Sequence, residues 1–110
     1  MEAGLNLKLK KALSEMLFLS ILEEQPRPIL EVSRLLGQRS GGVCSMQFPY
    51  AIVYRMMENG YIVEQGSRKT QDRRRTFYAL TDSGKDYLRG LEKDYKNFIN
   101  AVNRVFSKEL

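Results

Sequence analysis

Apolar residues recur every three or four positions along much of the chain, the spacing that aligns side chains on one face of a helix. The first such stretch covers residues 7–22, and Pro26 and Pro28 follow where a helix has to stop. A second stretch covers residues 29–36. Gly37 comes next, and glycine is favoured just beyond a helix end because it tolerates a positive φ. The pattern therefore predicts two helices, the second ending at Leu36.

Two further helices are predicted after a polar loop at residues 38–47. The third covers residues 48–59, with Pro49 in its first turn, where a missing N–H costs no helical hydrogen bond. The fourth begins at Thr81, whose hydroxyl can cap a helix N-terminus, and continues to Phe106. Its apolar positions are spaced alternately three and four residues apart, the period of a coiled-coil seam. These positions are Leu88, Leu91, Tyr95, Phe98, Val102 and Val105.

Between the third and fourth helices, two short runs have the composition of strands. Residues 61–63 and 77–80 are rich in aromatic and aliphatic side chains, and together they predict a β-hairpin. The segment between them, residues 64–76, is polar and basic, and we expect it to form a long loop at the hairpin tip. It holds five cations against Glu64 and Asp72, so it carries +3 of the chain's net charge of +5. These cations are Arg68, Lys69, Arg73, Arg74 and Arg75.

Three helices followed by a basic hairpin is the order of a winged helix-turn-helix, in which the third helix enters the DNA major groove. We therefore expect a mainly α fold with a small β-hairpin: a winged helix-turn-helix plus a long C-terminal dimerisation helix. Residues 1–80 would form the DNA-binding region and residues 81–110 the dimerisation helix, together one compact domain. A length of 110 residues suits a single domain.

The composition excludes several classes of function. The chain has 18 Lys and Arg against 13 Asp and Glu, no histidine, and one cysteine, Cys44. Histidine-based triads and metal sites are therefore excluded, as are internal disulfides and cysteine-based zinc clusters. The carboxylates stand in no constellation with a nucleophile, so we expect no enzyme activity, no metal and no cofactor. With no signal peptide and no apolar run long enough for a membrane, we expect a soluble cytoplasmic protein.

Three segments resemble the PadR-like transcriptional regulators. Residues 13–22 are similar to the family's opening helix, and residues 50–62, with an early tyrosine and a Gly-Tyr-Ile ending, to its recognition helix. Residues 77–84, Phe-Tyr-Ala-Leu-Thr-Asp-Ser-Gly, resemble the second hairpin strand and the Leu-Thr-x-x-Gly start of the last helix. The resemblance implies a dimeric DNA-binding transcriptional regulator, usually a repressor. Residues 46–49 depart from the family's small residues, so no base preference is carried over.

Cations and hydrogen-bonding side chains mark the expected contacts with double-stranded DNA. Lysine and arginine bind phosphates, arginine and glutamine can each form two hydrogen bonds to a base, and tyrosine can donate to a phosphate. The candidates are Arg39, Ser45, Gln47, Tyr50, Tyr54, Arg55, Arg68, Lys69, Arg73, Arg74 and Arg75. Alternatives remain open. The hairpin cations could be a solvated charge run, Tyr54 could pack on the hairpin or a partner, Arg55 could pair with Glu58, and the loop at 38–47 could be a plain connection.

The last helix is the expected homodimer interface. About 25 helical residues span roughly 37 Å, more than so small a head is expected to cover. The surplus apolar surface should therefore meet a second copy, although the stripe could also pack only on the first helix of its own chain. A two-fold dimer presents two recognition helices to two half-sites, which predicts an inverted-repeat operator.

Two further possibilities concern other partners. The resemblance implies a small aromatic effector at the dimer interface, and Phe18, Tyr87, Tyr95 and Phe98 could line its pocket, although aromatic residues at helical spacing are more often core. Cys44 could be a half-buried structural residue or a redox sensor, with no second cysteine to pair with. The alternative function is a winged-helix protein–protein interaction module whose basic hairpin faces an acidic partner.

Overall fold

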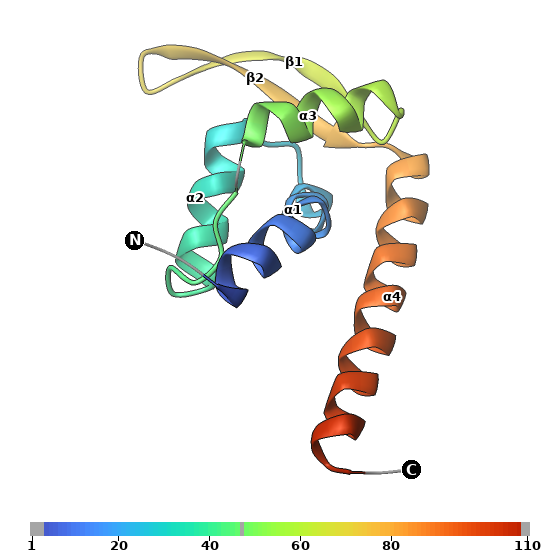
Figure 1. The fold of residues 1–110 in the computed structure, drawn as a ribbon. Coiled ribbons are helices and arrows are strands. Elements are labelled where there is room, and N and C mark those ends of the chain that lie inside the picture. Colours follow the sequence, from blue (N-terminus) through green and yellow to red (C-terminus); the bar gives the residue numbers. More distant parts are fainter. Residues whose placement is uncertain (1–3, 47, 109–110) are drawn as a thin grey trace.

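The computed structural model describes residues 4–46 and 48–108, and its elements follow the predicted order (Figure 1). Four helices and one antiparallel hairpin form a mainly helical winged helix-turn-helix, so the predicted fold class is confirmed. The elements are α1 (Leu5–Glu24), α2 (Ile29–Arg39), α3 (Pro49–Glu58), β1 (Ile62–Thr70), β2 (Arg73–Leu80) and α4 (Asp82–Phe106). No helix in the described ranges is long and apolar enough to cross a membrane.

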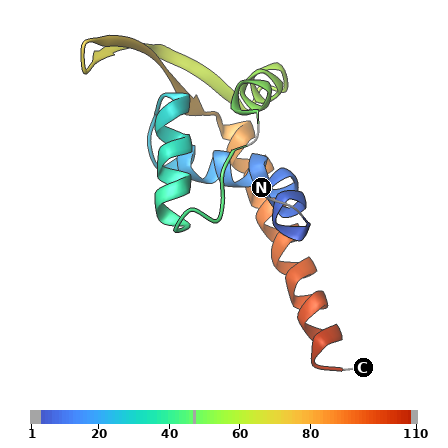
Figure 2. The ribbon, with the colours of Figure 1, turned by 60° about the vertical axis from the view of Figure 1, so that its left-hand side comes forward.

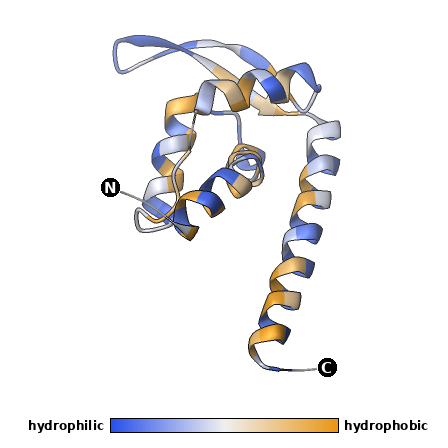
Figure 3. Ribbon diagram, viewed as in Figure 1, coloured by the Kyte–Doolittle hydropathy of each residue, from blue (hydrophilic) through white to orange (hydrophobic). Residues whose placement is uncertain are grey.

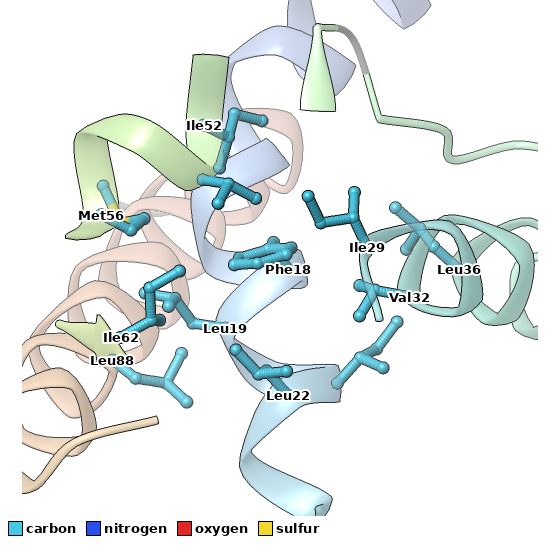
Figure 4. Packing of buried hydrophobic residues seen from close by; sticks show 12 residues of the cluster. Phe18, Leu19, Leu22, Ile29, Val32, Leu36, Ile52, Met56, Ile62 and Leu88 are labelled. Atoms are coloured by element: carbon cyan, nitrogen blue, oxygen red, sulfur yellow. The ribbon is translucent and has the colours of Figure 1, made fainter. Parts of the chain in front are cut away.

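Helix α1 is the centre of the fold, and it packs against α2, α4 and β2. Phe18, Leu19 and Leu22 project from it and are all but completely buried. In Figure 4, Phe18 lies between Ile29 of α2 and Ile52 of α3, so one ring joins three helices. Burial of a side chain of this size contributes about 2 kcal/mol to folding. Helices α1, α2 and α3 are thus held together by a shared apolar core.

Helix α2 does not end at Leu36, and the predicted capping role of Gly37 is wrong. Gly37 is helical, and the chain leaves the helix only after Arg39. Gly41 and Gly42 adopt the positive φ angles of 63° and 84° that reverse the chain, and the Gly42 N–H donates to the Gly37 carbonyl at 2.8 Å. A glycine pair beyond the helix therefore supplies the left-handed conformation that a single glycine inside it was expected to supply.

The loop that follows α2 is more than a plain connection. The Ser40 hydroxyl donates to the Leu36 carbonyl at 2.8 Å and accepts from the Cys44 N–H at 2.9 Å. One side chain therefore joins the end of α2 to the segment that leads to α3. Cys44 is a free thiol and is half-buried.

The hairpin is longer than predicted, and the expected loop at residues 64–76 is wrong. Strands β1 and β2 have nine and eight residues and are joined by Gln71 and Asp72 alone. Both turn residues have positive φ, 48° and 64°, as a two-residue hairpin turn of type I′ requires. Most of the segment is exposed on both faces, so it lacks the apolar alternation by which strands are recognised. The cations consequently stand on paired strands.

The base of the hairpin is tied to the helical body. The Arg27 N–H donates to the Tyr78 carbonyl and the Tyr78 N–H donates back to the Arg27 carbonyl, both at 3.0 Å. The buried Arg27 guanidinium also donates to Glu24 at 2.9 Å and Glu31 at 2.7 Å, one residue at each neighbouring helix end. The rest of the hairpin projects beyond the helices, and its far end is hydrophilic (Figure 3).

Helix α4 begins on the body and then leaves it (Figure 2). The predicted cap is confirmed, since the Thr81 hydroxyl accepts from the Gly84 N–H at 2.9 Å. Leu88 is 0% exposed in the core of its own chain, so its expected role as a dimer contact is wrong. Further along, Phe98 and Val105 are 70% and 72% exposed. The apolar stripe of α4 therefore begins in the core of its own protomer and continues along the second half of the helix, where it is exposed to solvent.

Candidate nucleic-acid interface

The strand register sets like charges opposite one another on the hairpin. Arg68 pairs with Arg75, and Lys69 pairs with Arg74. Side chains directly opposite on antiparallel strands have Cβ atoms about 5 Å apart, and like charges at that distance are destabilising. The hairpin therefore holds a concentrated positive charge that a polyanion would relieve.

The hairpin cations have no acidic partner within the described part of the chain. Arg68 lies over the ring of Phe77, with its guanidinium carbon 4.3 Å from the ring centre, and Arg74 donates to the Ser67 carbonyl at 3.3 Å. These contacts orient two guanidinium groups without neutralising them. Arg68, Lys69, Arg73 and Arg74 are exposed and Arg75 is half-buried.

Two hollows lie between the hairpin and the first turns of α2 and α3. One, of about 320 Å³, is lined by Arg34, Thr70 and Arg75 among others. The second, of about 230 Å³, brings Tyr50 of α3 together with Arg74 and Arg75 of β2. Arg34 and Thr70 were not among the expected contacts, because only the folded chain brings them to one hollow. The two hollows connect the hairpin cations to the predicted recognition helix.

The outer surface of α3 is aromatic. Phe48, which precedes the helix with a left-handed φ of 54°, is 73% exposed, and Tyr50 and Tyr54 are 53% and 67% exposed. Tyr54 thus keeps most of its ring in solvent. Burial raises the pKa of the Tyr78 hydroxyl, and nearby Glu64, Tyr54 and Tyr50 raise it further. Gln47 lies outside the described residues, and Ser45 is half-buried in the segment before α3.

Two of the expected DNA contacts are held by ion pairs. Arg39 donates to Glu24 at 2.9 Å, and this hydrogen bond lowers the pKa of the Glu24 carboxyl. Arg39 also stands at the end of α2 remote from the hairpin (Figure 1). Arg55 donates from Nε to Glu15 of α1 at 2.8 Å. The ion-pair alternative considered for Arg55 thus occurs in this structure, with Glu15 rather than Glu58 as the partner.

An apolar groove of about 460 Å³ runs between α1 and α4, and we call it the α1–α4 groove. Its apolar lining is Leu9, Ala12, Leu13 and Met16 from α1 and Leu91, Tyr95, Phe98 and Ile99 from α4, and Glu15 and Asp94 also line it. Two of the four aromatic residues expected in an effector pocket therefore line it. Phe18 and Tyr87 do not, because Phe18 is 1% exposed in the core and Tyr87 stacks on Tyr61 with ring centres 4.1 Å apart.

Comparison with known proteins agrees with the fold. Residues 18–90 match the model of the transcriptional regulator PadR-like family. No curated protein matches the chain. A transcriptional regulator from Clostridium thermocellum has a similar structure, with 20% identity, a TM-score of 0.78, and coverage of 88% of this chain and 96% of that one.

Two other solved structures show the same fold. The PadR family transcriptional regulator from Eggerthella lenta has 20% identity and a TM-score of 0.77, over 91% of this chain and 87% of that one. The PadR-like transcriptional regulator from Bacillus cereus has 20% identity and a TM-score of 0.76, over 90% and 96% of the two chains. Since the family model spans more than half of its length, this chain belongs to the PadR-like family of DNA-binding transcriptional regulators, which are not enzymes.

Proposed function

We propose that the protein is a repressor that binds an inverted-repeat operator as a homodimer. The observation that carries this proposal is the double row of opposed, unneutralised cations on the hairpin, next to the exposed face of α3. Phosphate groups relieve that repulsion and release counterions from the DNA, which favours binding. A dimer seated on an operator excludes other proteins from the same stretch of duplex, and repression follows from that exclusion.

On the duplex, α3 enters the major groove and the hairpin follows the neighbouring backbone. About four of the five hairpin cations, which are Arg68, Lys69, Arg73, Arg74 and Arg75, contact phosphates in this arrangement. Tyr50 and Tyr54 face the groove, with Gln47 before them as a candidate for adenine and Ser45 for a phosphate. Arg39 and Arg55 are each paired with a carboxylate, and they would join the interface through the N–H groups that these pairs leave free.

In vitro selection of bound duplexes with the purified protein tests this proposal as a whole. We expect enrichment of an inverted repeat whose half-sites are centred about one helical turn apart, because each protomer supplies one α3. Enrichment of single half-sites would contradict the dimer. No enrichment at all would favour the alternative, an acidic protein partner for the hairpin.

The homodimer rests on the exposed apolar half of α4 and on the α1–α4 groove beside it. We expect Phe98→Glu to convert the dimer into a folded monomer, because a second chain would then bury an unpaired charge. Light scattering measures the mass, and circular dichroism checks that the helices remain. Asn97→Glu is the matched control, with the same added charge at the adjacent exposed position. Dimers in both variants would place the interface elsewhere.

A small aromatic effector completes the proposal. Tyr95 and Phe98 offer ring surfaces in the α1–α4 groove, at the face where a second copy would pack. A compound bound there would stabilise a relative orientation of the two protomers that does not fit the operator, and it would thereby lower the affinity for DNA. The effector part fails if the dimer core is fully packed and no aromatic compound changes DNA affinity.

A further inference from the structure

A carboxylate stands where three helices meet. Glu15 of α1 accepts from Arg55 of α3, with Nε at 2.8 Å and Nη2 at 2.5 Å from Oε2. Its other oxygen, Oε1, accepts from the hydroxyl of Tyr87 of α4 at 3.0 Å. Each oxygen of one carboxylate thus serves a different helix, one belonging to the DNA-reading part and the other being the proposed dimerisation helix.

The surroundings hold this cluster in place. Tyr61, just beyond α3, stacks on Tyr87 with an interplanar angle of 8°. Burial raises the pKa of the Tyr87 hydroxyl, and the hydrogen bond to Glu15 raises it further, so the hydroxyl keeps the proton that it donates. The Glu15 side chain is 27% exposed, which leaves the ion pair partly shielded from solvent. An ion pair in this setting is worth more than one at a fully exposed position.

The charges in the cluster cancel. Arg55 is the only cation of α3, and Glu15 neutralises it, whereas the hairpin carries a net +3. Glu15 binds the Nε and Nη2 side of the guanidinium and so fixes its orientation, while the remaining N–H groups, including those of Nη1, are not used by the pair. A movement of Arg55 out of this orientation would leave the partly shielded Glu15 carboxylate without its cation. Removing one partner from such a pair is costly.

We propose that Glu15 is a positioning residue for DNA binding: it holds α3 at a set angle to α1 and α4 through Arg55 and Tyr87, and Arg55 acts as a strut rather than a base contact. This inference rests on the proposed function, since it concerns how the same α3 is presented to DNA. It predicts that the pair matters through its geometry and not through the sign of the charge at position 55.

An exchange of the two charges tests the strut. We expect Glu15→Gln and Arg55→Gln each to weaken binding to a selected duplex about tenfold. A loss of this size is typical when the interaction between two contacting side chains is removed. The salt dependence should be unchanged, because no phosphate contact is lost. The exchanged protein, Glu15→Arg with Arg55→Glu, should recover to within about threefold of the parent, because the pair is rebuilt in reverse. Fluorescence anisotropy at several salt concentrations gives both quantities, and thermal unfolding reports folding.

A direct DNA contact by Arg55 gives the opposite pattern. Arg55→Gln would then make the log–log slope of affinity against salt concentration shallower by about two, because a dimer loses two contacts. Glu15→Gln would tighten binding, and the exchanged protein would bind more weakly than either single variant. Single variants that lower the melting temperature but leave the affinity unchanged would also overturn the proposal.

A milder variant covers the case in which the exchanged protein does not fold. Tyr87→Phe keeps the stacked ring and removes only the hydroxyl, and we expect a loss of affinity of about threefold with an unchanged salt slope. An unchanged affinity in this variant would contradict the strut. A parent protein that binds no duplex would instead refute the proposed function, so the two failures are distinguishable.

Discussion

Replacing Arg73, Arg74 and Arg75 by alanine is expected to weaken DNA binding about a thousandfold at physiological salt, the scale of losing six phosphate contacts in a dimer. If about four cations per protomer meet phosphates, the parent dimer neutralises about eight, and the log–log slope of affinity against salt is near −7. The variant retains about one cation per protomer, so its slope should be near −2. A mobility-shift or anisotropy titration over a range of salt concentrations measures both effects.

The control for this variant removes the same charge elsewhere. Lys93, Lys96 and Arg104 are exposed on α4, away from the hairpin, and replacing all three by alanine also lowers the net charge by three. We expect this control to change the affinity only slightly, since distant exposed charges are screened at physiological salt. Equal losses in the two triple variants would show that the overall charge, and not the hairpin, binds DNA.

Gly84→Ala is expected to lower the free energy of unfolding by about 3 kcal/mol or more, a large part of the total for a small domain. A Cβ atom at position 84 would lie 2.1 Å from the Tyr61 carbonyl oxygen and 2.7 Å from Cδ1 of Leu80. The carbonyl has little freedom to retreat, because it already accepts from the Thr81 N–H at 3.0 Å. The first turn of α4 would have to move away from the end of α3.

A second glycine in the same helix is the matched control. A Cβ at Gly90 meets no atom within 4 Å, so Gly90→Ala should raise the stability by about 1 kcal/mol through helix propensity alone. Denaturant unfolding followed by circular dichroism, at one protein concentration for all variants, gives the two values. Similar changes in both proteins would mean that α4 is not in contact with the Tyr61 backbone.

The elements that the sequence could predict are those with one solvent-exposed face and one buried face. Helices α2, α3 and α4 have this character, so their apolar spacing located them, and Thr81 marked the start of α4. Helix α1 packs against α2, α4 and β2, and it was located by its apolar residues and the prolines that follow it. Most of the hairpin was not predicted, because both faces of its outer part are exposed to solvent and its sequence therefore lacks an apolar alternation. Its turn, Gln71-Asp72, also lacks the glycine that commonly marks a two-residue hairpin.

Only those parts of the candidate site whose residues are neighbours in the sequence could be predicted. The cations of the hairpin are neighbours along the chain, so their concentration was visible before their pairing. Arg39 and Glu24 are 15 residues apart, and Arg55 and Glu15 are 40 apart, so only the folded chain brings these pairs together. Leu88 shows the same limit, because a 3.5-residue stripe does not reveal whether its own core or a partner covers it.

The two-residue turn of the hairpin also restricts how this regulator can diverge. The pairing of Thr70 with Arg73 leaves no slack at the tip, and the register shift between Glu64 and Ser67 shows that an unmatched residue is accommodated in the strands as a bulge. Apart from such a bulge, lengthening keeps the pairing regular only when both strands gain residues together. The reach of the hairpin along a DNA backbone should therefore change among descendants in matched steps, whereas its arginines can be exchanged one at a time.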